Sequence, residues 1–142
     1  MNDLKIQNEI KDVLKSMFNA YSAKNIEKGV ECVDENVFMF GSGKDEIAKN
    51  IKELKKGLSR DFSQADKLKC SIKYLRIWNN TSAACVSGYV TYSISTGNEK
   101  NVFNYRYTCV LEKKNKKWKI VSSHMSEPSA NQEAGKSYAK AK

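Results

Sequence analysis

The sequence predicts an α+β domain in which three N-terminal helices pack against a curved antiparallel sheet shaped like a cone. Up to about residue 58, apolar residues recur at the three- and four-residue spacing of amphipathic helices. From Lys67 onward they alternate with polar residues, and short polar turns interrupt the alternation, as expected for hairpin-linked strands. Because a sheet of long strands twists and curls, helices can cover its inner face and leave a hollow between them.

The first two predicted helices occupy the chain up to about residue 33. The longer one should begin at Asn2 or Asp3, since either side chain can act as an N-cap. Its wide apolar stripe contains Leu4, Ile6, Ile10, Val13, Leu14, Met17, Phe18 and Tyr21. A break at residues 23–25 then leads into a shorter helix over residues 26–33.

A buried strand is expected at residues 37–40, followed by a turn at residues 41–43 and a third helix. The helical period of the third helix is carried by Ile47, Ile51, Leu54 and Leu58. Gly57 and the polar residues 59–61 should mark its end.

Four long strands fill the second half of the chain and are expected at residues 67–78, 83–94, 102–112 and 118–125. Gly88 should mark a bulge or bend, because glycine inside a strand often does. Pro128 should end the sheet, since proline has no N–H to donate to a ladder. The domain is therefore expected to span residues 1–128, and residues 129–142 should form a flexible tail rich in lysine and alanine.

The composition limits the class of partner. The net charge of +9 attracts anions weakly, but only three arginines are present and the lysines are dispersed along the chain. We therefore expect no specific nucleic-acid partner. No apolar run approaches the roughly 18 residues of a membrane span, and the polar start differs from a signal peptide. These features predict a cytoplasmic protein with no membrane partner.

Four cysteines are present, and none forms a CxxC pair. A metal site or a disulfide framework would need closer pairing, so we expect free thiols and no metal. No nucleotide or flavin motif is present, and no cofactor is expected.

Several segments are similar to one known family. They are Tyr105–Lys113, Trp118–Val121 and His124–Pro128, with Ala20–Ile26 and Phe40–Gly43 upstream. Together they resemble the SnoaL-like domains of the nuclear transport factor 2-like superfamily over residues 8–128. The resemblance implies a cystatin-like α+β roll, but no single activity, since the superfamily holds isomerases, cyclases, dehydratases and transport adaptors.

The steroid-isomerase members of that superfamily use a tyrosine and an aspartate whose positions fall near Met17 and Phe40. Both residues are apolar here, which argues against that proton-shuttle chemistry. The polyketide-cyclase members need a pocket carboxylic acid near the end of the sheet, where His124 is the nearest titratable group.

His124 lies on the last predicted strand and is the only histidine. Strict alternation places Trp118, Ile120, Ser122, His124 and Ser126 on one face, which should point into the cone. There His124 could be a general acid or base, with an ordinary pKa of about 6.5, or a neutral imidazole that lines the pocket.

Other polar residues complete the expected ligand-binding set of Tyr21, Arg106, Tyr107, Ser122 and His124. The two tyrosines can bury their rings and present hydroxyls to a hollow. Arg106 faces away from His124 unless a single bulge brings it to that side. Inside, it would clamp a carboxylate; outside, it would pair with an acidic residue or lie in a dimer interface. Asp34 and Asp61 lie near helix ends, where capping is the expected role.

Three functions remain open from the sequence. The first is a domain that binds a small apolar or weakly acidic molecule inside the cone. The second is an isomerase, cyclase or hydrolase that uses His124. The third is a dimerising module with a vestigial pocket, which pairs two copies through an outer sheet face that carries Val110, Val121 and Met125.

Overall fold

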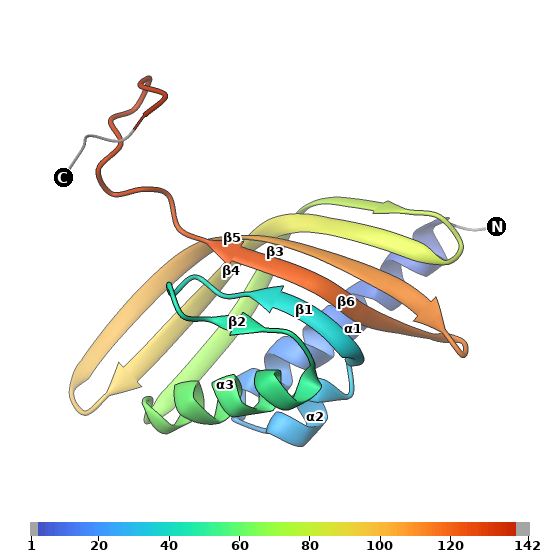
Figure 1. Ribbon diagram of the computed structural model, residues 1–142, viewed down its shortest axis with the longest axis horizontal. Coiled ribbons are helices and arrows are strands. Elements are labelled where there is room, and N and C mark those ends of the chain that lie inside the picture. Colours follow the sequence, from blue (N-terminus) through green and yellow to red (C-terminus); the bar gives the residue numbers. More distant parts are fainter. Residues whose placement is uncertain (1–2, 139–142) are drawn as a thin grey trace.

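The computed structural model describes residues 3–138 and consists of helices packed against one face of a six-stranded sheet (Figure 1). The elements are α1 (Asp3–Ser22), α2 (Ile26–Val30), β1 (Val33–Phe40), β2 (Ile47–Ala48), α3 (Ile51–Ser63), β3 (Lys67–Asn79), β4 (Ala83–Thr96), β5 (Glu99–Lys114) and β6 (Lys117–Ser126). The α+β class, the N-terminal helices and the curved sheet predicted from the sequence are confirmed.

Helix α1 follows the predicted stripe closely. Its buried residues are Ile6, Ile10, Leu14, Met17, Phe18, Ala20 and Tyr21. Asp3 lies in the first turn of the helix, and the alternative cap Asn2 lies outside the described residues. Figure 1 shows α1 running beneath the sheet, where it covers the inner face.

Helix α2 is shorter than predicted, and β1 begins earlier. Asn25 caps α2 by accepting a hydrogen bond from the Lys28 N–H at 3.1 Å. Val33, expected at the end of this helix, instead opens β1 and pairs with Ile120 of β6. Extended backbone buries Val33 against the core, and this burial outweighs the helical spacing that the sequence suggested.

The third helix was misplaced at both ends. Ile47 lies in the short strand β2, opposite Phe40, and not in a helix. Helix α3 begins after Asn50, whose side chain accepts from the Glu53 N–H at 2.9 Å. It continues to Ser63 because Phe62 extends the buried stripe by another turn, so Gly57 lies in its middle.

The strand order is β2-β1-β6-β5-β4-β3. Strands β3 to β6 form the predicted antiparallel meander, and β1 adds a parallel neighbour to β6. The bulge expected at Gly88 lies on the opposite strand, between Tyr74 and Arg76. Gly88 is required there because a Cβ would clash with the carbonyl oxygen of Lys73.

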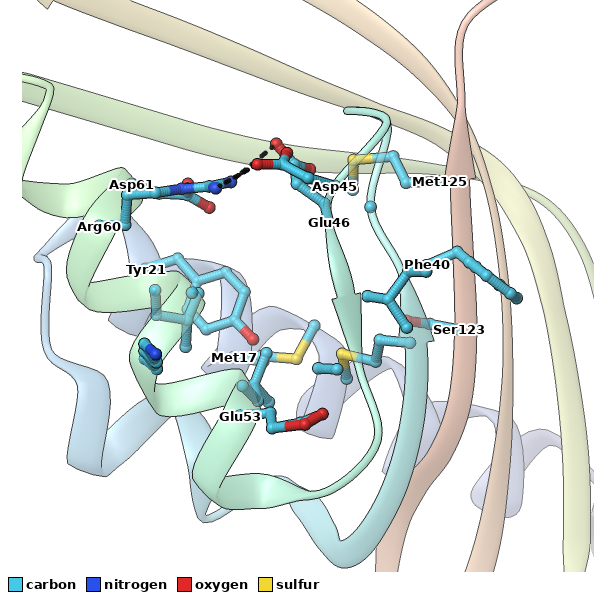
Figure 2. A pocket seen from close by; sticks show the side chains of 18 of the residues that line it. Met17, Tyr21, Phe40, Asp45, Glu46, Glu53, Arg60, Asp61, Ser123 and Met125 are labelled. Atoms are coloured by element: carbon cyan, nitrogen blue, oxygen red, sulfur yellow. Dashed lines mark hydrogen bonds and ion pairs between the residues drawn. The ribbon is translucent and has the colours of Figure 1, made fainter.

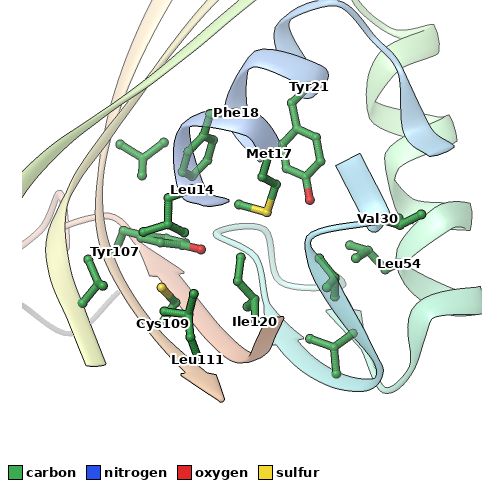
Figure 3. Packing of buried hydrophobic residues seen from close by; sticks show 14 of the residues in the cluster. Leu14, Met17, Phe18, Tyr21, Val30, Leu54, Tyr107, Cys109, Leu111 and Ile120 are labelled. Carbon is green, nitrogen blue, oxygen red and sulfur yellow. The ribbon is translucent and has the colours of Figure 1, made fainter. Parts of the chain in front are cut away.

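The core lies between α1 and the inner sheet face (Figure 3). Ile10, Leu14, Leu111 and Ile120 are fully buried at its centre. In the second turn of α1, the Glu9 carboxylate accepts a hydrogen bond from the Trp118 indole N–H at 2.9 Å, which fixes the helix to β6.

After Ser126 the chain leaves the sheet, and residues 127–138 contain neither helix nor strand (Figure 1). The flexibility expected of the tail stays a prediction, and its last residues, 139–142, lie outside the described part. Across residues 3–138, no helix has the length and apolar character needed to span a membrane.

Candidate ligand-binding cavity

A cavity of about 450 Å³ opens between α1, α3, the β1–β2 connection and the inner sheet face (Figure 2). Most of its wall is apolar and comes from Met17, Phe18, Met39, Leu54, Leu58 and Met125. Its inner polar groups are Tyr21, Tyr92, Tyr107 and Ser123. A largely apolar space with a few polar groups is typical of small-molecule sites.

The tyrosines of the cavity are neutral phenols at physiological pH. Burial is the main cause that raises the pKa of Tyr21, Tyr92 and Tyr107 above the usual value for tyrosine. Each hydroxyl therefore keeps its proton and can donate a hydrogen bond. Because these rings come from α1, β4 and β5, the two layers of the fold are both needed to assemble them.

Tyr107 carries an unpaired hydroxyl. Its side chain is only 4% exposed, and the hydroxyl has no hydrogen-bond partner of normal geometry among the described residues. The neighbouring Cys109 thiol is at most a weak partner. Figure 3 shows the hydroxyls of Tyr107 and Tyr21 pointing toward the middle of the buried cluster, near Met17. A buried polar group of this kind is costly unless something else satisfies it.

A bulge in β6 decides which residues of this strand reach the cavity. Ile120 pairs with Leu111 and Ser122 pairs with Val110, so Val121 is an extra residue. Before it, Trp118 and Ile120 face the core; after it, Ser123 and Met125 do. The prediction that Ser122 and His124 continue the inner face is wrong, because strict alternation does not survive a bulge.

His124 consequently lies exposed on the outer face of the sheet. Its ring is 5.2 Å from the ring of Phe40, measured between centroids. The expected placement inside the cone, on which its acid–base role depended, is therefore incorrect. Met125, expected on the outer face, lines the cavity instead.

Arg106 shares the outer face with His124. The single bulge does bring the two to the same side, as the conditional prediction required, but that side is outside the cone. The Arg106 guanidinium donates to the Glu127 carbonyl oxygen at 3.3 Å. It is not a carboxylate clamp inside the cavity.

Charged residues that the sequence did not assign to the cavity form its mouth, defined here as Asp45, Glu46, Arg60 and Asp61 (Figure 2). The Arg60 guanidinium lies 3.0 Å from Asp45, 3.6 Å from Glu46 and 3.5 Å from Asp61, each distance from nitrogen to carboxylate oxygen. Asp61 is thus part of an ion-pair cluster that joins α3 to the turn before β2, and it is not a cap. In the sequence, Asp61 lies about one turn beyond the expected end of the third helix, and this position was the only indication that it could belong to the mouth.

The glycines before Glu46 allow this geometry. A Cβ at Gly41 or Gly43 would clash with the Glu46 side chain, which lies over the turn. The turn is closed by the Gly41 N–H, which donates to the Glu46 carbonyl at 2.8 Å. Burial, and next the nearby Glu46 charge, raise the pKa of Asp61, while Arg60 opposes the rise.

The sequence profile of the SnoaL-like domain matches residues 10–130, which is most of the chain. The chain belongs to the SnoaL-like family. Comparison with curated proteins gave no match.

Solved structures agree with this SnoaL-like domain in fold. A nuclear transport factor 2-like superfamily protein from Salmonella enterica has 13% identity and a TM-score of 0.82, over 96% of this chain and 100% of that one. A protein of unknown function with a cystatin-like fold from Nostoc punctiforme has 17% identity and a TM-score of 0.74, over 87% and 92%. A candidate scytalone dehydratase from Novosphingobium aromaticivorans has 13% identity and a TM-score of 0.78, over 87% and 84%. At these identities the likeness shows the fold alone.

Among residues 3–138 of the SnoaL-like domain, no group of three or more histidine, cysteine or acidic side chains is placed to hold a metal ion. Met17 and Phe40, which stand near the positions of the catalytic tyrosine and aspartate of the steroid isomerases, are both close to the cavity. Met17 lines the cavity, whereas Phe40 lies at its edge with its ring against His124. The polar groups of the cavity come from other positions.

Proposed function

We propose that this SnoaL-like domain binds a small, mainly apolar molecule with an oxygen acceptor inside the cavity. The supporting observation is that Tyr107, a residue of the cavity wall, has a buried hydroxyl without a hydrogen-bond partner. A ligand carbonyl, ether or hydroxyl oxygen would accept its hydrogen bond, and this would remove the cost of leaving the donor unpaired.

The remainder of the cavity suits an apolar body. Met17, Met39 and Met125 line it, and their unbranched thioether chains can adjust to ligands of different shape. Of the two ligand types expected from the sequence, the apolar one is favoured, because carboxylates at the mouth repel a weak acid in its ionised form. Catalysis by His124 is not part of the proposal, since its ring lies on the outer face.

Methionine-methyl NMR tests the proposal, because three of the four methionines line the cavity. With methyl-labelled protein, 4-phenyl-2-butanone should shift the signals of Met17, Met39 and Met125. Butylbenzene, which lacks the carbonyl, should bind more weakly. In Tyr107→Phe the ketone should lose about fivefold in affinity, as expected for one neutral hydrogen bond, while butylbenzene should be unaffected.

Tyr107→Phe should also raise the free energy of unfolding by about 1 kcal/mol, because the buried hydroxyl has no partner to lose. The matched control is Tyr74→Phe, whose hydroxyl donates to the Lys11 carbonyl at 3.4 Å and whose loss should not stabilise the protein. Chemical denaturation measures both. Absence of any methyl shift with either probe would remove the proposal.

We also infer that a second copy of the chain binds the outer sheet face. Phe38 and Phe40, the latter also at the cavity edge, are 40% and 41% exposed there, and Val110 lies on the same face. These side chains come from neighbouring strands and so form one apolar area, which supports an interface between copies. Analytical ultracentrifugation tests this, and the experiment is developed below.

A cytoplasmic location is a further part of the proposal. All four cysteines are free thiols, two of them buried, which suits a reducing compartment. Cell fractionation tests it, and recovery of the protein from an oxidising compartment would contradict it.

A further inference from the structure

The charge of the cavity lining is opposite to that of the whole protein. The chain has a net charge of +9, yet the lining contains four carboxylates and only two cations. Two of the carboxylates, Glu46 and Asp61, are 34% and 47% exposed, so they face solvent at the mouth without being fully hydrated. A ligand that enters must pass this negative region.

Arg60 does not neutralise the mouth. Its single guanidinium is shared by Asp45, Glu46 and Asp61, at distances of 3.0 to 3.6 Å. One positive charge against three negative ones leaves an excess of negative charge. The upward shift of the Asp61 pKa agrees with this excess, because the favourable effect of Arg60 does not cancel burial and the charge of Glu46.

The two other charged lining residues do not change this sign. Glu53 lies in the first turn of α3, and its carboxylate already accepts a hydrogen bond from the Lys49 N–H at 3.2 Å. Lys56, also on α3, adds one positive charge to that of Arg60. Without Glu53, three carboxylates still face two cations.

The acidic mouth and the phenol-lined cavity are one site. Burial is the main cause that raises the pKa of Tyr21 and Tyr92, and the charge of Asp61 adds a smaller effect in the same direction at both. Aromatic faces beside a carboxylate form a favourable environment for an organic cation. Deeper in the same cavity, the unpaired Tyr107 hydroxyl, in a side chain that is 4% exposed, independently indicates a ligand.

We propose that the cavity selects molecules whose apolar body ends in a cationic group, such as a protonated amine. The cation would lie at the mouth near Glu46 and Asp61, and the apolar body would lie among the methionines and phenol rings. This inference rests on the proposed function and names the ligand class of the same site.

Three probes with the same apolar body isolate the effect of the terminal charge at the mouth, because none has an oxygen acceptor at the end that would lie deep in the cavity near Tyr107: 4-phenylbutan-1-amine, 4-phenylbutan-1-ol and 4-phenylbutanoate. At neutral pH they carry a positive, zero and negative charge. Titrations followed by methionine-methyl NMR should show the ammonium binding about tenfold more tightly than the alcohol, and the carboxylate binding most weakly. Added salt should reduce the preference for the ammonium.

Charge-removing variants identify the source of the preference. Glu46→Gln and Asp61→Asn should each reduce the preference for the ammonium about threefold and leave the alcohol unchanged. The matched control is Glu99→Gln, the same charge change on the exposed strand end at the β4–β5 hairpin, and it should retain the preference. The methyl spectra of the free variants verify that each is folded.

The outcomes distinguish this inference from the proposed function. Equal affinities of the wild type for the ammonium and the alcohol, or a preference that is undiminished in both mouth variants, would overturn the inference and leave cavity binding intact. If no probe shifts the methyl signals of Met17, Met39 and Met125, both proposals fail together.

Discussion

Four ionisable side chains around the cavity show how burial sets protonation at the scale of single residues. Burial raises the pKa of Tyr21, Tyr92 and Tyr107, so these phenols stay protonated and remain hydrogen-bond donors. At Asp61 burial acts in the same direction, but the group is half exposed and lies beside Arg60. The result is a cavity with neutral donors inside and negative charge at its mouth.

Asp61→Asn should therefore stabilise the protein at neutral pH. A carboxyl group whose pKa is higher in the folded state than in the unfolded state is destabilised when it ionises on the folded protein. This penalty is fully present above the raised folded pKa and disappears below the unfolded pKa of about 3.9. Because solvent screens a half-exposed group, the gain in unfolding free energy should be small, on the order of a few tenths of a kcal/mol.

Urea denaturation across a pH series measures the difference between wild type and Asp61→Asn. The difference should be greatest near pH 7 and should shrink as the pH falls through the folded pKa of Asp61. Glu99→Gln removes one negative charge at the start of β5, outside the cavity lining, and serves as the control for net charge. A wild type that is more stable than Asp61→Asn at pH 7 would show that Arg60 outweighs burial and Glu46.

At the scale of elements, hydrophobic periodicity was enough to predict the arrangement of helices and long strands. The stripe of α1 and the alternation in β3 to β6 repeat over many residues, so a single irregular position does not hide them. Short elements were not predictable in the same way. Ile47 and Val33 fit a helical spacing by chance, and only pairing with distant strands assigns them to β2 and β1.

The bulge at Val121 explains most of what was missed in the candidate site. One extra residue moves every later side chain of β6 to the opposite face of the sheet. The sequence around Val121 has no glycine or proline that would indicate the bulge. Tyr21 and Tyr107 were placed well because neither depends on the register of β6. Ser123 and Met125 were missed, and Ser122 and His124 were placed inside, because all four depend on that register. The acidic mouth was missed for a different reason, since Arg60 and Asp61 lie on α3 beyond its predicted end.

Two neighbouring serines test this register directly. Ser123 is 8% exposed and lines the cavity, so Ser123→Leu should place a larger side chain there and weaken butylbenzene binding at least about tenfold. Ser122 points to the outer face between Phe38 and Val110, so Ser122→Leu should leave binding unchanged. Methionine-methyl titration measures both. If β6 alternated without a bulge, the two variants would exchange their effects.

At the scale of the whole molecule, the two faces of the sheet have different environments. Helices cover the inner face, and the outer face has no covering element among residues 3–138 (Figure 1). A cross-strand row on the outer face joins Phe38 through Ser122 to Val110, and continues through Cys85 to Trp78. Phe38, Val110 and Trp78 in this row are 40%, 37% and 49% exposed, which is unusual for side chains of this size.

If two copies pair through this row, one charged substitution within the row should disrupt the dimer. Ultracentrifugation of the wild type at high micromolar concentration should give twice the chain mass of 16.1 kDa. Phe38→Asp buries a carboxylate in the interface and should weaken the dimer at least about tenfold, with little effect on folding since Phe38 is already 40% exposed.

Val102→Asp is the control, because Val102 is 56% exposed on the same strand as Val110 but eight residues away, near the β4–β5 turn. A wild type that stays monomeric, or equal effects of the two aspartates, would exclude this face as the interface, and the cavity proposals would be unaffected because their residues lie on the other side of the sheet.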